Sequence, residues 1–241
     1  PSEGIIRMTI EPFWLDIFAF VFFVLLWAGY ASFAKKRSAT DVCLASVMHL
    51  YRVQWAKALM SRENRIADIS VIMTFERNMA FLGSSALIII AGLLTLLGNT
   101  NQAVNLFAHI PFAIDQNLAQ LELKIAILIA MFVYAFFKFS WAMRQTSFAA
   151  VIIAGAPQGH REELSTQEEK DAAERIARVV SMAGHHFNFG IRTYYFALAV
   201  ITWFINSWVF MGATALVVWV LYRREFRSSV LHTLAGNHSK A

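Results

Sequence analysis

The chain has 241 residues, of which 58% are hydrophobic and only 15% are charged, and its mean hydropathy is +0.51. A soluble domain has about 45–50% apolar and about 25% charged residues, so this composition excludes an ordinary soluble protein and favours an integral membrane protein. The formal charge of +5 fits the basic cytosolic loops of membrane proteins. No basic stripe with interleaved aromatic residues indicates binding to nucleic acid.

The first apolar segment, about residues 13–34, is long enough to cross the roughly 30 Å hydrocarbon core of a bilayer as a helix. Trp14 lies toward one end of this segment, and Trp27 and Tyr30 lie toward the other, as in an aromatic belt. We interpret Asp16 as an interfacial acid near the N-terminus of this helix.

The next segment, about residues 40–61, carries apolar residues at spacings of three and four, and Arg52 and Lys57 lie off that stripe. This pattern predicts an amphipathic helix on the membrane surface. A second amphipathic helix is expected at about residues 165–183, after a helix cap at Ser165 or Thr166.

Two further spans are expected at about residues 79–98 and 123–143. The earlier of the two contains small residues that allow another helix to approach closely, namely Gly83, Ser84, Ser85 and Gly92.

The last apolar region has no charged residue from Thr193 to Leu221. As a single helix it would measure roughly 46 Å between its flanking arginines, slightly more than a whole bilayer of about 40–45 Å. As a hairpin it would turn near residues 204–208, where Asn206 and Ser207 are typical turn residues. The hairpin keeps the basic C-terminal tail on the same side as the other basic segments, so we favour it.

The sequence therefore predicts an all-α integral membrane helical bundle that forms one domain, residues 1–241. About five transmembrane helices are expected, and four, with a long last helix, are the alternative. The five spans are about 13–34, 79–98, 123–143, 188–205 and 208–226. Residues 35–77 carry eight Lys and Arg and residues 99–121 carry none, so we place the N-terminus outside and the C-terminus in the cytosol.

Lys138 raises the question of why an ammonium group lies within an apolar span. It can extend back toward the headgroups, or it can join acids and bases at the same depth. The candidate polar network consists of Arg65, Asp68, Glu76, Lys138, Asn188 and Arg192. In one such arrangement Lys138 pairs with Glu76 or Asp68, and Arg192 pairs with the other acid. The network either specifies the fold or forms a polar pocket.

No catalytic motif and no metal-binding motif is found, and we expect no cofactor. The single cysteine, Cys43, excludes an intrachain disulfide. Whether the chain is an enzyme is left open, and a non-enzymatic role is favoured.

Four stretches are distinctive: "WAKALMSRENRIADISVIMTFERNMAFLGSSALIIIAGLLTLL" (55–97), "KFSWAMRQ" (138–145), "FNFGIRTYYFALAVITWF" (187–204) and "VLYRREFRSS" (220–229). Together they resemble a family of bacterial multi-pass membrane proteins, with plant relatives, that carries a domain-of-unknown-function label. The resemblance covers roughly residues 8–234 and implies an integral protein of a bacterial inner membrane, without implying an activity. The polar residues within these stretches are Arg62, Glu63, Arg65, Asp68, Lys138, Arg144, Asn188, Arg192, Arg223, Arg224 and Glu225.

These observations favour a structural or auxiliary membrane protein that forms a homo-oligomer or joins a larger membrane complex. A small transporter or channel with a polar site at the cytosolic leaflet is the alternative, and an enzyme acting on lipid or quinone is less favoured. The expected partners are membrane lipid and either a second copy or another protein, and not nucleic acid.

Overall fold

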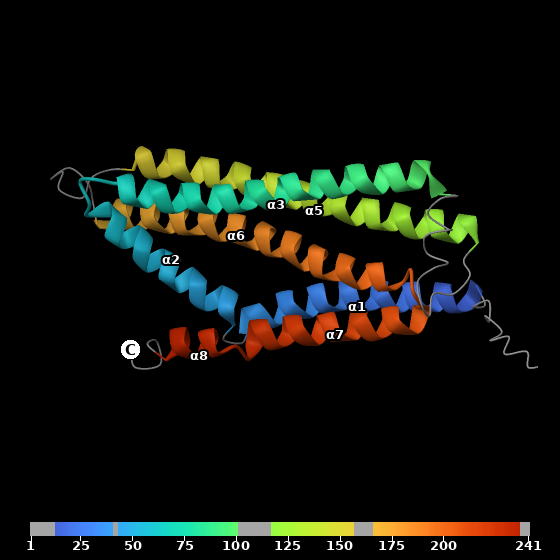
Figure 1. Ribbon diagram of the computed structural model, residues 1–241. Coiled ribbons are helices and arrows are strands. Elements are labelled where there is room, and N and C mark those ends of the chain that lie inside the picture. Colours follow the sequence, from blue (N-terminus) through green and yellow to red (C-terminus); the bar gives the residue numbers. More distant parts are fainter. Residues whose placement is uncertain (1–12, 41–42, 101–116, 157–165, 237–241) are drawn as a thin grey trace, which may run out of the picture.

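The computed structural model describes residues 13–40, 43–100, 117–156 and 166–236, and this part of the chain contains helices and no strand (Figure 1). The predicted all-α class is therefore confirmed. The helices are α1 (Phe13–Thr40), α2 (Leu44–Met60), α3 (Ile66–Gly98), α5 (Leu118–Ala154), α6 (Thr166–Thr202), α7 (Ser207–Phe226) and α8 (Ser229–Ala235).

The last apolar region is a helical hairpin, so a single long last helix is wrong. α6 ends at Thr202, and the next helix begins after Asn206, whose side-chain oxygen accepts a hydrogen bond from the backbone N–H of Trp208. An asparagine in this position satisfies a backbone donor that the first turn of a helix cannot pair internally. The turn therefore forms where the sequence predicted it.

Four predicted elements differ from the structure in their extent. The amphipathic helix expected at 165–183 and the span expected at 188–205 form one continuous helix, α6, because no Pro separates them. Likewise, the spans expected at 79–98 and 123–143 are parts of the longer helices α3 and α5. Most of the connection expected at 99–121 lies outside the described residues.

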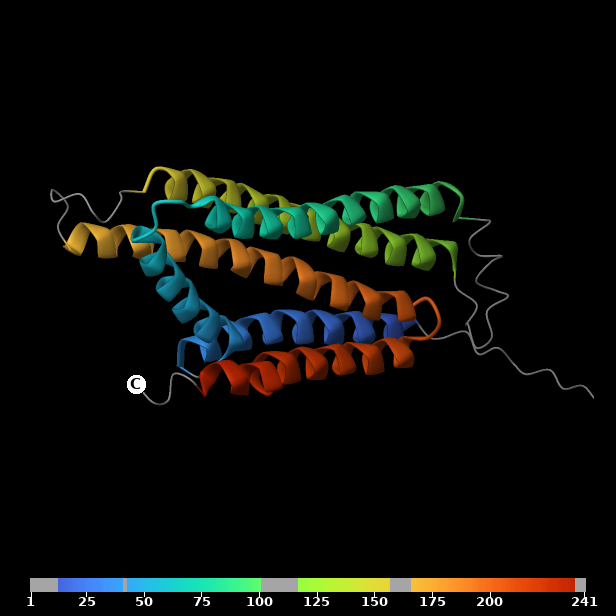
Figure 2. The ribbon, with the colours of Figure 1, turned by 60° about the vertical axis from the view of Figure 1, so that its left-hand side comes forward.

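The long helices are arranged as two pairs bridged by α6. α3 packs along α5, α1 packs along α7, and α6 contacts both α5 and α7. Figures 1 and 2 show α6 crossing obliquely from the α3–α5 pair to the α1–α7 pair. The two pairs lie close together where α1 begins, and they are farther apart where α2 crosses between them (Figure 1).

An aromatic core joins α1, α6 and α7. The Phe23 ring packs at centroid distances of 5.8 Å from Phe196 and 5.3 Å from Phe210, and Trp203 stacks on Phe210 at 4.8 Å. Such pairs add about 0.5–1.5 kcal/mol each beyond the burial of their area.

α5 and α6 approach each other closely at Gly190. A Cβ atom added to this glycine would lie 2.5 Å from a ring carbon of Phe139, so only glycine fits at this crossing. Gly83 on α3 also faces Phe139, with 3.7 Å between an added Cβ and the Phe139 Cβ. These small residues therefore pack inside the chain rather than on its outer surface.

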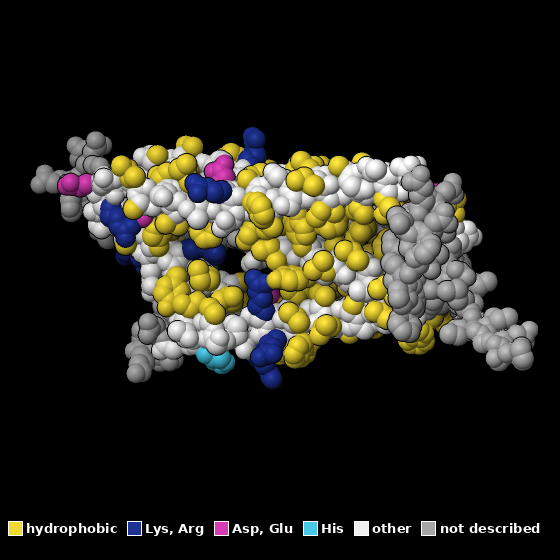
Figure 3. Space-filling model, viewed as in Figure 1, with side chains coloured by type: hydrophobic (Ala, Val, Ile, Leu, Met, Phe, Trp, Pro, Cys, Tyr) yellow, Lys and Arg dark blue, Asp and Glu magenta, His cyan; other side chains and the backbone are white. Residues whose placement is uncertain are grey.

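Within the described residues, three helices are long and apolar enough to cross a membrane, over Trp14–Ala34, Ile66–Gly98 and Leu118–Ala154. Large apolar side chains on these helices face outward, including Leu25, Phe81, Ile88 and Phe137. Figure 3 shows apolar side chains along the middle of the bundle, and charged ones concentrated toward the end where α2 lies. The charged end and the apolar middle are those of an integral membrane protein.

Candidate functional site

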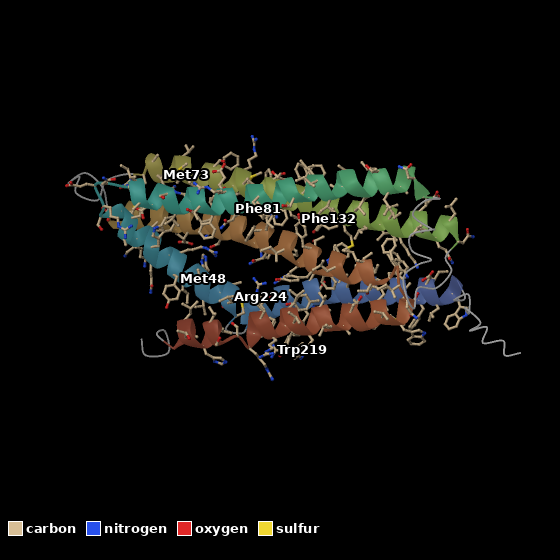
Figure 4. All side chains as sticks on the ribbon, viewed as in Figure 1. Met48, Met73, Phe81, Phe132, Trp219 and Arg224 are labelled. Atoms are coloured by element: carbon tan, nitrogen blue, oxygen red, sulfur yellow. The ribbon has the colours of Figure 1, made fainter. Side chains whose placement is uncertain are left out.

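A cavity of about 790 Å³ lies between α2, α6 and the C-terminal part of α7, and residues of α3 and α5 close its far side. Figure 3 shows this face of the molecule hollowed, with Lys and Arg side chains around the hollow. In Figure 4, Met48 on α2 and Arg224 on α7 lie beside this space. The charged and imidazole side chains that line it are Arg52, Arg178, Arg192, Arg224, His49, His185, His186 and Glu225.

Arg52 is the most distinctive of these cations. α2 holds its half-buried side chain against α6, where one guanidinium nitrogen donates to the Ser181 hydroxyl at 3.4 Å. The guanidinium lies over Gly184, at 2.9 Å from where a Cβ atom would be, so the glycine makes room for it. His49 Nδ1 lies 2.9 Å from the same Ser181 hydroxyl. Two basic side chains thus converge on one hydroxyl at the cavity wall.

No carboxylate lies within 4.0 Å of the Arg52 guanidinium among the residues that the structure describes. Burial lowers the pKa of this guanidinium from its usual value, which means that the protein disfavours the charged form. A buried cation ordinarily has an anionic partner, because the loss of hydration is otherwise not compensated.

Arg192 differs from Arg52 because it has an internal acid. Its guanidinium donates to Glu225 Oε2 at 2.5 Å, and the Tyr30 hydroxyl donates to the same oxygen at 3.0 Å. The guanidinium also lies 5.4 Å from the centre of the Tyr30 ring. Tyr30, Arg192 and Glu225 thus connect α1, α6 and α7 at the edge of the cavity. The prediction that Arg192 pairs with Asp68 or Glu76 is therefore wrong.

Lys138 has no acid within 4.0 Å among the described residues, so the prediction that it pairs with Glu76 or Asp68 is also wrong. Its ammonium lies instead over two aromatic rings, 5.1 Å from the centre of Tyr134 and 5.6 Å from that of Phe189. Arg192 lies 5.7 Å from the same Phe189 ring. The structure therefore brings Lys138 and Arg192 together as two cations that share one aromatic side chain.

The register between α3 and α5 explains why the expected acid is out of reach. Gly83 faces Phe139, so Lys138 lies at the level of residue 83 or 84 on α3. Glu76 is about 10 Å farther along the helix and Asp68 about 22 Å, at 1.5 Å per residue. Glu76 instead accepts a hydrogen bond from the Ser147 hydroxyl at 3.4 Å.

Asp68 and Arg65 belong to a separate cluster at the end of α3. The buried Asp68 carboxylate pairs with Arg62 and accepts a hydrogen bond from the Trp55 indole at 2.7 Å. Arg65 donates at 3.0 Å to the Ile153 carbonyl near the C-terminus of α5, which needs donors for its last carbonyls. This cluster fixes α2, α3 and α5 to one another.

Asn188, the remaining candidate, is exposed on α6 and lines the cavity beside Arg192. Of the six candidates, Arg192 and Asn188 thus line the cavity, and Lys138 reaches Arg192 through Phe189. Arg65, Asp68 and Glu76 lie elsewhere. A role for the six as one functional site remains a prediction.

A buried ion pair at the opposite end of the bundle was not foreseen. Lys124 Nζ lies 3.4 Å from Asp16 Oδ1, and the same oxygen accepts hydrogen bonds from the Trp203 indole at 2.7 Å and the Ser207 hydroxyl at 2.5 Å. Both charged residues are almost fully buried. Asp16 lies in the first turn of α1, as predicted, and is the centre of a contact between α1, α5 and the α6–α7 turn. The only sequence signal was that both charges lie near the ends of predicted spans.

The histidines at the cavity do not form a metal centre with acids or a cysteine. Within the described ranges no group of three His, Cys, Asp or Glu residues could hold a metal ion. The chemistry that the arrangement offers is the binding of negative charge, since four arginines and one carboxylate line the cavity.

Comparison with known proteins gives a family and no activity. A model of a protein family of unknown function, DUF599, matches residues 18–230. No curated protein and no solved structure matches the chain. The resemblance to a family of unknown function that the sequence indicated is thus confirmed, and its polar motif residues Arg192 and Glu225 form the pair at the cavity edge. The chain belongs to the DUF599 family.

Proposed function

We propose that this chain is a multi-pass membrane protein that binds an anionic amphiphile, with a phosphate or carboxylate head and an apolar tail, in the cavity between α2, α6 and α7. The observation that carries the proposal is Arg52, a half-buried guanidinium at the cavity wall with no carboxylate in reach among the described residues. A bound anion would offset the burial cost of this cation.

The rest of the lining supports an amphiphile rather than a small inorganic anion. Methionine and aromatic side chains form much of the wall, including Met48, Met79, Met182, Phe75 and Phe187. Methionine adapts its shape to irregular apolar ligands, which suits a flexible tail. A volume of about 790 Å³ lies within the range of ligand-binding cavities, about 300–1,000 Å³.

The proposal places the cavity at the cytosolic leaflet of a bacterial cytoplasmic membrane, with five crossings, the N-terminus outside and the C-terminus inside. Arg223, Arg224 and Arg227 at the end of α7 lie on the same side of the bundle as α2, which supports this orientation by the positive-inside rule. Asn99→Cys, made with Cys43→Ser, tests it in intact cells. An impermeant thiol reagent outside the cell should label the introduced thiol, and labelling only after lysis would reverse the topology.

Binding is tested by calorimetric titration of the detergent-purified protein with dihexanoyl phosphatidic acid. Arg52→Gln should weaken binding by about 1.5–3 kcal/mol, the usual contribution of a hydrogen bond to a charged group, or about 10–150-fold in Kd. Arg77→Gln is the matched control, because Arg77 on α3 is exposed and does not line the cavity. Absence of binding by the unchanged protein, or equal Kd values for the two variants, would overturn the proposal.

A structural or auxiliary role in a larger assembly is the second candidate, and one observation favours it. A Cβ added to Gly29, Gly92 or Gly212 would meet no atom within 4 Å, so these glycines leave open space at the outer surface of the chain. Small residues at such positions allow another transmembrane helix to approach closely. Native mass measurement in mild detergent distinguishes the candidates: a stable oligomer or bound protein supports assembly, whereas a monomer that retains lipid supports ligand binding.

A further inference from the structure

A second concavity lies on the outer side of the α1–α7 pair. This groove has a volume of about 410 Å³, and Leu25, Gly29 and Phe33 of α1 face Ala215, Trp219 and Tyr222 of α7 across it. Trp219 and Leu25 are largely exposed, and Figure 4 shows Trp219 on the outer side of α7. In a membrane this apolar groove faces the acyl chains of the bilayer.

Tyr30 separates the groove from the cavity. Its side chain lines the groove, and its hydroxyl donates to Glu225 Oε2 at 3.0 Å. Glu225 and its partner Arg192 line the cavity on the other side. The hydrogen-bonded side chains of Tyr30 and Glu225 thus lie between the two spaces.

We infer that the ligand reaches the cavity from the bilayer, as an anionic lipid of the inner leaflet that passes between α1 and α7 at Tyr30 and Glu225. This inference rests on the proposed function. During its passage the lipid crosses the groove, and the headgroup displaces Glu225 from Arg192 on its way to Arg52, so that the bound lipid lies in the cavity and leaves the groove empty. In this structure the passage from the groove to the cavity is closed by the hydrogen bond from Tyr30 to Glu225 and by the Arg192–Glu225 pair.

The charges at the inner end of the groove favour a lipid over a second copy of the chain. The Arg37 guanidinium lies 5.5 Å from the centre of the Phe33 ring, and that of Arg223 lies 5.7 Å from the centre of Trp219. Both rings line the groove. A second copy docked symmetrically would bring these arginines close to their own equivalents, which is unfavourable, whereas an anionic headgroup is attracted to them.

The route predicts a specific kinetic behaviour. A residue that blocks or loosens a passage changes the association and dissociation rates by the same factor, so the equilibrium constant does not change. A route from the cytosol predicts instead that substitutions in the groove leave both rates unchanged. The two routes are therefore distinguished by rates and not by affinity.

Gly29→Leu fills the groove. Gly92→Leu is the matched control, because an added Cβ meets open space at both glycines and Gly92 lies on α3, away from the groove. An environment-sensitive dye on Ala45→Cys, with Cys43→Ser, reports cavity occupancy, because Ala45 is exposed at the lining. In stopped-flow mixing with micelles that contain dioleoyl phosphatidic acid, Gly29→Leu should slow both rates about tenfold or more with Kd unchanged.

Tyr30→Phe provides a second and opposite test, because it removes the hydrogen bond to Glu225 and keeps the ring. It should raise both rates about tenfold or more, since one hydrogen bond to a charged group is lost from the closed passage. The bilayer route would be overturned if the protein binds the lipid but Gly29→Leu and Tyr30→Phe show the same rates as Gly92→Leu. The proposed binding in the cavity would then still stand. An unchanged protein that does not bind would overturn both proposals.

Discussion

The buried pair of Asp16 and Lys124 allows the sharpest prediction on stability. Lys124→Met retains the length of the side chain but leaves the Asp16 carboxylate buried without a cation. Asp16 keeps its hydrogen bonds from Trp203 and Ser207, and these do not neutralise its charge. Removing one partner of a buried ion pair costs about 3–5 kcal/mol, because the remaining charge is uncompensated.

The assay is reversible unfolding in mixed micelles, with the free energy of unfolding measured for each variant. Lys57→Met on the exposed side of α2 is the control and should change this free energy by less than about 0.5 kcal/mol. Asp16→Asn combined with Lys124→Met should recover most of the loss, since both buried charges are then absent. A cost below about 1 kcal/mol for Lys124→Met, the range of exposed ion pairs, would refute the burial of this pair.

Three further predictions concern packing and charge elsewhere in the chain. Gly190→Ala should destabilise the protein by about 1–3 kcal/mol, because the added methyl group overlaps the Phe139 ring. Gly212→Ala should be nearly neutral, because its methyl group meets open space, and thermal unfolding compares the two variants. Asp68→Asn should lower the free energy of unfolding by about 1–3 kcal/mol, because it weakens the contact of the buried Asp68 carboxylate with Arg62. An unchanged midpoint of thermal unfolding would count against this prediction. Glu225→Gln should tighten the binding of dihexanoyl phosphatidic acid about two- to tenfold, because a competing anion is removed, and weaker binding in the titration would contradict this.

The sequence alone predicts those features of the fold that depend on local pattern. The apolar segments, the basic segments between them and the turn at Asn206 follow from composition, charge and cap residues, which act over a few positions of the chain. The unbroken α6 was missed for a related reason. The change from an amphipathic to an apolar pattern near Phe187 indicates where a helix leaves one environment for another, and it does not indicate where the helix ends.

The pairing of charges depends on tertiary register and could not be predicted. Lys138 and Asp68 were expected at a similar depth, yet the register set by Gly83 and Phe139 places them about 22 Å apart along α3. Glu225, the partner of Arg192, lies 33 positions away in sequence across the α6–α7 turn. For each base, several acids are expected at a similar depth in the membrane, and only the packing of the helices determines which of them becomes its partner.

The central claim is that the cavity at Arg52 holds an anionic amphiphile, and native mass spectrometry of the protein released from its own membranes tests it most directly. We predict that the unchanged chain and Arg77→Gln each retain one acidic lipid, and that Arg52→Gln retains none. Equal lipid retention by Arg52→Gln and Arg77→Gln, or an unchanged chain that carries no lipid under conditions that keep it folded, would contradict the account.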